Sequence, residues 1–210
     1  MTRRNPWALS GALFVVLVLV AFLALGGDTP DGDDSAQKVV SFYSKHETRE
    51  IIAAVVLGLA GIVLVYFAAM VRERVRDHDR TALPAFAFGA GIVAAGGFLA
   101  AAAIHFALAD YAEDIQPDAA QALNALDSDF FLPFALGTVA FVLGISLIAL
   151  RSRFLPAWLG WVGVVLFVIS FTPIGFIGFG LAGIWIIVVS VMLYLRGDAP
   201  ADVAVAPVPG

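Results

Sequence analysis

The sequence contains no cysteine among its 210 residues and few charged residues. The absence of cysteine excludes disulfides, thiolate zinc sites, cysteine nucleophiles and cysteine-ligated iron–sulfur clusters. Charged residues make up only 14% of the chain, compared with about 25% in a typical soluble domain. The formal net charge is −5, so the chain also lacks the overall basic charge that is typical of nucleic-acid-binding proteins.

Hydrophobic residues are correspondingly abundant. They account for 61% of the chain, and the mean hydropathy is +0.94. A single soluble domain of this length could not bury so much apolar surface, and the same composition excludes disorder. The composition therefore predicts an all-α, polytopic membrane protein.

Apolar runs of about 20 residues, the length that crosses the hydrocarbon of a bilayer, predict spans at 7–26, 48–71, 82–110 and 130–150. The following stretch, 156–195, would be about 60 Å long as a single helix, which is twice the hydrocarbon thickness. Pro173 and Gly175 near its middle predict a hairpin of two spans, 156–172 and 175–195. We therefore expect one six-span transmembrane domain over residues 1–196. The first span should be retained, because its apolar core is longer than that of a cleaved signal.

Two segments between the spans predict short amphipathic helices on the outer surface of the membrane. Residues 35–46 place Val39, Phe42 and Tyr43 at helical spacing and continue into the second span. Residues 117–127 begin with a proline and place alanine and leucine side chains on one face. The last residues, 197–210, are rich in proline, alanine and valine, which predicts a disordered cytoplasmic tail.

The distribution of charge predicts the orientation of the chain. With six spans and both termini inside, nine of the twelve basic residues fall on the inner side. The outer segments, 27–50 and 110–129, hold most of the acidic residues. This asymmetry follows the positive-inside rule and predicts a bacterial cytoplasmic (inner) membrane protein with both termini in the cytoplasm. A five-span alternative would place Arg196 outside, beside the acidic segments.

The order of these features resembles a known family. The features are the Phe42-Tyr43-Ser-Lys-His46 segment, the charged inner loop 72–80, the Leu-Pro-x-Trp-Leu-Gly-Trp block at 155–161, and the last hairpin. Over most of 36–196 the chain is similar to six-span bacterial membrane proteins of the domain-of-unknown-function 4386 type. The resemblance implies a topology and no activity, so it assigns no functional residue.

Away from the ends of the predicted spans, His105 is the one histidine, acidic or basic side chain. Ionisable groups within a membrane are candidates for function. His105 precedes Asp110 by five residues, which places it about 7.5 Å below the outer interface. One hypothesis is a proton-relay or cation site, with Asp110, Glu113 and Asp114 above the histidine. The alternative is a neutral structural histidine that bonds to a neighbouring helix or to water.

Small residues accompany His105 along its helix. Gly89, Gly97 and Ala101 precede it in steps of four or eight residues. Small residues at such spacing allow two helices to approach closely. We therefore expect Gly89, Gly97 and Ala101 to lie at a helix–helix contact, with His105 facing the same neighbour.

His46 and Glu50 lie four residues apart at the start of the second span and share a helix face. Together with His105 and the acids at 110–114, they could form a histidine–carboxylate metal site. The known His-Glu-x-x-His motif, however, has a second histidine where Glu50 stands. A solvated helix start is the alternative, and we predict no metal or cofactor.

The sequence leaves three hypotheses about function. The first is a non-enzymatic integral membrane protein with a structural, regulatory or partner-binding role, because no complete catalytic set is present. Its partners would be the lipid bilayer and either another membrane protein or a second copy, and no nucleic acid. The second is a small transporter or an ion or proton pathway around His105 and the outer acids. The third is a metal-assisted membrane hydrolase.

Overall fold

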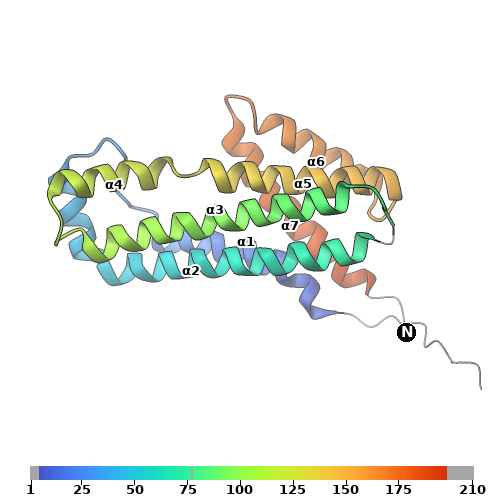
Figure 1. Ribbon diagram of the computed structural model, residues 1–210, viewed down its shortest axis with the longest axis horizontal. Coiled ribbons are helices and arrows are strands. Elements are labelled where there is room, and N and C mark those ends of the chain that lie inside the picture. Colours follow the sequence, from blue (N-terminus) through green and yellow to red (C-terminus); the bar gives the residue numbers. More distant parts are fainter. Residues whose placement is uncertain (1–4, 77, 198–210) are drawn as a thin grey trace, which may run out of the picture.

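The computed structural model describes residues 5–76 and 78–197, and every regular element within them is a helix (Figure 1). The all-α prediction is therefore confirmed for the described chain. The predicted tail at 197–210 lies outside the described residues except for Gly197. In chain order the elements are η1 (Pro6–Leu9), α1 (Ser10–Leu19), η2 (Val20–Leu25), α2 (Ala36–Arg76), α3 (Leu83–Tyr111), α4 (Pro117–Asp129), α5 (Leu132–Ser152), α6 (Ala157–Ile169) and α7 (Gly175–Arg196).

Five helical stretches of the described chain are long and apolar enough to cross a membrane. They are Pro6–Leu25, Ala36–Arg76, Leu83–Tyr111, Pro117–Ser152 and Gly175–Arg196. Large apolar side chains such as Ile52, Leu59 and Phe106 are exposed on their outer faces, as expected where helices meet lipid. These helices fit a polytopic membrane protein. The remaining helix, α6, has only 13 residues.

The predicted helix at 35–46 is the first part of α2, which has 41 residues. It does not present its apolar face to a surface, because Val39 and Tyr43 are fully buried in a small core with Leu108 of α3 and Ala120 of α4. The segment is continuous with the rest of α2, and the buried face of the helix passes from Val39 and Tyr43 through the charged Glu50 to Ala53. The predicted helix at 117–127 corresponds to α4, which runs nearly in line with α5 (Figure 1).

The first part of α2, the last part of α3, α4 and the segment 26–35 form one end of the molecule, here called the α4 end (Figure 1). At the opposite end lie the last turns of α2, α5 and α7 and the first turns of η1, α3 and α6. Arginines join these turns, and we call this the arginine end. Arg74 donates to the Leu193 carbonyl at 3.1 Å, and the Arg151 Nε lies 3.5 Å from the Asp79 carboxylate.

Glycine residues bring α3 and α5, which run antiparallel, into close contact. A Cβ atom on Gly144 would lie 2.8 Å from the Ala87 Cβ, and a Cβ on Gly97 would lie 2.5 Å from the Phe134 backbone nitrogen. Gly137 approaches the Ala94 backbone in the same way. Close backbone approach of this kind requires glycine, and it fixes the register of α3 against α5.

Not all of the predicted small-residue stripe lies at this contact. Ala101 is buried, whereas Gly89 is exposed and a Cβ added there would meet nothing within 4 Å. The reason is geometric, because four residues turn a helix by about 40° more than one full rotation. Two such steps carry Gly89 away from the face that holds Gly97.

Candidate functional site

His105 lies between two carboxylates that come from two other helices. Its Nδ1 is 2.7 Å from Oδ2 of Asp127 on α4, and its Nε2 is 3.1 Å from Oε2 of Glu50 on α2. We call these residues the Glu50–His105–Asp127 triad. The triad joins the three helices of the α4 end at the level where α4 passes into α5.

The triad is largely withdrawn from solvent. The Glu50 side chain is fully buried, and those of His105 and Asp127 are 12% and 17% exposed. A buried carboxylate requires a partner charge or strong hydrogen bonds. Arg49 supplies a second partner for Glu50, because its Nε lies 2.9 Å from Oε1 of that carboxylate. Glu50 therefore has a cationic partner on one oxygen and the imidazole on the other.

The hydrogen bonds indicate which ring nitrogens of His105 carry a proton. An ionised carboxylate only accepts hydrogen bonds, so each ring nitrogen donates to the oxygen that it faces. When both acids are ionised, the ring carries two protons and a positive charge. The charges of His105 and Arg49 then balance those of Glu50 and Asp127. No ring nitrogen remains free to accept a proton from a substrate.

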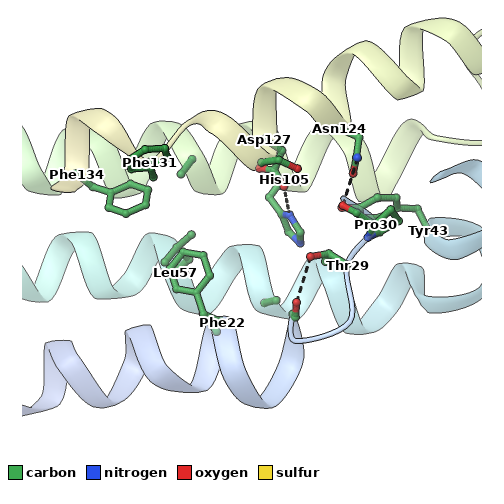
Figure 2. Close-up of a pocket in the computed structure, with 15 residues that line it drawn as sticks. Phe22, Thr29, Pro30, Tyr43, Leu57, His105, Asn124, Asp127, Phe131 and Phe134 are labelled. Atoms are coloured by element: carbon green, nitrogen blue, oxygen red, sulfur yellow. Dashed lines mark hydrogen bonds and ion pairs between the residues drawn. The ribbon is translucent and has the colours of Figure 1, made fainter. Parts of the chain in front are cut away.

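A cavity of about 230 Å³ lies against His105 and Asp127. Figure 2 shows apolar side chains, among them Phe22 and Phe131, on one side of His105, and Thr29, Tyr43 and Asn124 on the other. The segment 26–35 closes the cavity, because the Asn124 amide donates to the Asp31 carbonyl at 2.9 Å. The cavity thus has an apolar part and a polar part.

The Tyr43 hydroxyl is the one unsatisfied group on the polar side of this cavity within the described chain. Tyr43 is fully buried, and its hydroxyl has no hydrogen-bond partner among the described residues. Its ring stands edge-on to the His105 ring, with centroids 5.9 Å apart. Buried hydroxyls are almost always hydrogen-bonded. Tyr43 is among the residues that line the cavity.

The structure brings together only some of the residues singled out in the sequence. Glu50 joins His105 in the triad, whereas the His46 Nδ1 faces the Phe42 carbonyl of its own helix at 2.9 Å. Glu113 accepts a hydrogen bond from Ser44. Asp110 and Asp114 are both exposed, so none of these three acids forms part of the triad.

Asp127 is the functional candidate that the sequence analysis missed. Ala120 and Asn124 are buried on the inner face of α4, and Asp127 follows them three residues later on the same face. Polar residues on the otherwise apolar face of the 117–127 helix were the signal in the sequence.

The histidine–carboxylate metal site that the sequence analysis considered does not form in the described part of the chain. Among residues 5–76 and 78–197 no three His, Asp or Glu side chains converge as they would around a metal ion. His46 is turned to its own backbone, and both nitrogens of His105 face carboxylates. His46 and His105 therefore do not share a set of ligands in the described part of the chain.

An aromatic layer separates the triad from the arginine end. Phe98 stacks on Phe134 with ring centroids 4.7 Å apart and meets Phe14 edge-on at 5.3 Å. Deeper hydroxyls bond to backbone close by, as Ser146 does to the Val142 carbonyl at 2.7 Å. This layer offers no chain of polar side chains leading from the triad toward the other end.

Comparison of the chain with protein-family models, curated proteins and solved structures gives no match. The class of protein is defined by the fold and the site together. Over residues 5–76 and 78–197 the chain is all-helical, with five membrane-length apolar helices and a buried histidine–carboxylate triad beside a cavity at one end. The arrangement of the triad and the cavity at the α4 end is therefore the starting point for a proposal about function.

Proposed function

We propose that the chain is a non-enzymatic integral membrane protein with a regulatory or partner-binding role, and that its α4 end carries the binding site. The cavity beside His105 and Asp127 is the observation that carries this proposal. Ligand sites are concave, mostly apolar, and hold a few well-placed polar groups. This cavity has that character, with phenylalanine side chains on one side and the triad on the other.

The state of His105 supports a role without catalysis. A general base needs a free ring nitrogen within reach of a substrate proton. Both nitrogens of His105 are engaged by carboxylates from neighbouring helices. The triad is thus built to hold three helices around the cavity, and the cavity is left to hold a ligand.

Six spans are part of the proposal, although α6 is short. An apolar groove is lined jointly by the start of α5, including Leu132, and by Thr172 and Pro173 of the turn between α6 and α7. The hairpin turn therefore reaches the depth at which α5 begins. A hairpin that extends as far as a 21-residue helix accounts for the fifth and sixth spans.

The proposed membrane is the bacterial cytoplasmic membrane, with both termini in the cytoplasm and the α4 end outside. The separation of basic and acidic residues supports this orientation. Arg74, Arg151 and Arg196 gather at the arginine end, whereas Glu50, Asp127 and the acidic segment 26–35 lie at the α4 end. The same topology fits the six-span family of the 4386 type that the sequence resembles. The bilayer and either a second copy or another membrane protein are the proposed partners.

A proton pathway is the second candidate, and the triad is the observation that favours it. Three titratable side chains joined by hydrogen bonds of 2.7 and 3.1 Å form a short relay. A pathway must also continue across the membrane, and the aromatic layer around Phe98 and Phe134 lies in its way. The relay geometry therefore needs a functional test.

Proton flux in proteoliposomes distinguishes the two candidates. The full chain is reconstituted with a pH-sensitive dye inside, and the decay of an imposed pH gradient is followed. We expect the parent protein, His105→Gln and the control His46→Gln to match protein-free liposomes. Faster decay with the parent and the control, abolished by His105→Gln, would overturn the proposed binding role in favour of the pathway.

A further inference from the structure

We propose that the cavity binds the head of a single-chain amphiphile that carries a primary ammonium group, with the alkyl tail in an adjoining apolar groove. The inference rests on the proposed binding role and names its ligand class. Two features carry it, namely the continuity of cavity and groove and the arrangement of acceptors around the head site.

The groove has a volume of about 610 Å³ and lies between the start of α5 and the turn that joins α6 to α7. Its walls are mostly apolar, with Leu136 and Phe176 both exposed on the outer face of the helices. Such a face lies within the membrane when the helices span it. An alkyl chain is the occupant that matches this lining and this location.

The cavity and the groove are continuous. Phe22, Phe131 and Phe134 line both of them. The Phe22 and Phe134 rings lie 6.2 Å apart, and the Phe134 and Phe179 rings lie 5.9 Å apart. A ligand that occupies both spaces has its polar group beside the triad and its tail along the phenylalanines. This division of polar and apolar lining defines an amphiphile rather than a uniformly apolar ligand.

The acceptors at the head site match a primary ammonium group. The Tyr43 hydroxyl oxygen is buried and has no partner among the described residues. Asp127 contacts His105 through Oδ2, so its other oxygen is available from the cavity. An ammonium group has three donors and no acceptor. It can donate to the Tyr43 oxygen and to the Asp127 carboxylate together.

The surrounding charge selects a cation over an anion. Segments 27–50 and 110–129, which contain the α4 end, hold twelve acidic and three basic side chains. A field of this sign attracts cations and repels a carboxylate head. Phenylalanine rings at the junction also favour a nearby cation. An anionic amphiphile with the same tail therefore provides the matched comparison.

Thermal unfolding of the full chain in a non-ionic detergent tests the inference. The probes are octylammonium, octanoate with the same tail length, and methylammonium with the head alone. We expect octylammonium to raise the unfolding temperature in a saturable manner, because a ligand that binds the folded state stabilises it. Octanoate and methylammonium should give little change at the same concentration. An equal shift with octanoate would overturn the inference.

Two variants locate the binding. Asp127→Asn should raise the half-saturating concentration of octylammonium about tenfold, and Tyr43→Phe about threefold, as expected for loss of a charged and a neutral hydrogen bond. Leu59→Ala, on the exposed apolar face of α2, should leave it unchanged. Tyr43→Phe retains the aromatic ring and remains informative if Asp127→Asn does not fold. If both variants fold and both bind octylammonium as the parent does, the proposed head site is wrong. If Asp127→Asn does not fold, parent-like binding by Tyr43→Phe alone would overturn the head site. Proton flux that depends on His105 would instead overturn the proposed function, so the two failures are distinguishable.

Discussion

At the residue scale, the buried carboxylate of Glu50 depends on its neighbours. It is fully buried and is held by His105 and Arg49. Replacing His105 with Gln removes a charged donor, so we expect a loss of about 1–3 kcal/mol in the free energy of unfolding. Glu50→Gln alone should cost a similar amount. The double variant should cost less than the sum of the two, with a coupling energy of about 0.5–3 kcal/mol.

Unfolding in mixed micelles, followed by circular dichroism, measures these free energies. His46→Gln is the matched control, because the His46 ring contacts Phe42 of its own helix, through the carbonyl oxygen and the aromatic ring of that residue. It should change stability by no more than about 0.5 kcal/mol. Additive effects of Glu50→Gln and His105→Gln would show that the two side chains do not interact.

The sequence predicted part of this cluster for a physical reason. His105 is conspicuous because an ionisable group within an apolar run is costly. Glu50 was a candidate because it shares a helix face with His46 at the start of the second span. The partnership of Asp127 could not be predicted in the same way. It depends on how α4 docks on α2 and α3, and the linear sequence separates Asp127 from His105 by 22 residues.

At the element scale, the contact between α3 and α5 depends on glycine. A Cβ on Gly97 would lie 2.5 Å from the backbone nitrogen and 2.8 Å from the Cα of Phe134. Backbone atoms cannot move aside cheaply, so we expect Gly97→Ala to lower the free energy of unfolding by about 1–3 kcal/mol. Gly89→Ala should raise it by up to about 1 kcal/mol, because alanine favours the helix and meets no neighbour there.

Thermal or denaturant unfolding of the two alanine variants, in one detergent, measures this difference in sign. Equal effects at both positions would contradict the close packing of α3 on α5. The sequence analysis did place Gly97 on a stripe of small residues, but it assumed that the stripe repeats every four residues. Ala87 and Ala94, with Gly137 and Gly144 opposite them, follow steps of seven, which drift by only about 20° per step. A seven-residue repeat therefore keeps the same face of α3 in contact with α5.

The turn before α3 gives a pH-dependent prediction. Hydrogen bonds from the Thr81 hydroxyl and amide hold the pKa of Asp79 below its ordinary value of 3.8, with Arg151 nearby as a further cause. A lowered pKa in the folded state stabilises the protein above pH 3.8, and this contribution disappears as the pH falls through the folded value. The parent should therefore be more stable than Asp79→Asn at neutral pH.

Unfolding midpoints of the parent and of Asp79→Asn, measured from neutral pH down to below pH 3.8, test this prediction. The difference should be constant at neutral pH and should shrink only in the acidic range, because the asparagine variant lacks the titrating group. A difference that is independent of pH throughout would show that the Asp79 charge does not contribute. Thr81→Val offers a second variant, since it removes the hydroxyl that bonds to Asp79.

At the scale of the whole molecule, hydropathy predicted most of the helices but not where the 35–46 helix packs. The expected spans 48–71 and 175–195 lie within α2 and α7, and those at 7–26, 82–110 and 130–150 differ from helices of the structure by at most two residues at an end. The break at Pro173 separates α6 from α7. The sequence predicted that the 35–46 helix continues into the second span, but it placed this helix on the outer surface, whereas its apolar face is buried. That burial depends on Val39 and Tyr43 finding Leu108 and Ala120, which are contacts between segments distant in sequence. The triad and its cavity lie at the base of this extension.

The proposed orientation is tested by labelling, because the chain has no native cysteine to interfere. Ser35 immediately precedes α2 at the α4 end and is exposed, whereas Ser152 ends α5 at the arginine end. With the α4 end outside, Ser35→Cys should react with a membrane-impermeant maleimide in intact cells. Ser152→Cys should react only after the membrane is permeabilised, since the basic end is retained in the cytoplasm. Both variants should be labelled after lysis, which controls for accessibility of the thiol.

Labelling of Ser152→Cys but not of Ser35→Cys in intact cells would reverse the orientation. The cavity would then face the cytoplasm, so that any ligand would have to be a cytoplasmic one.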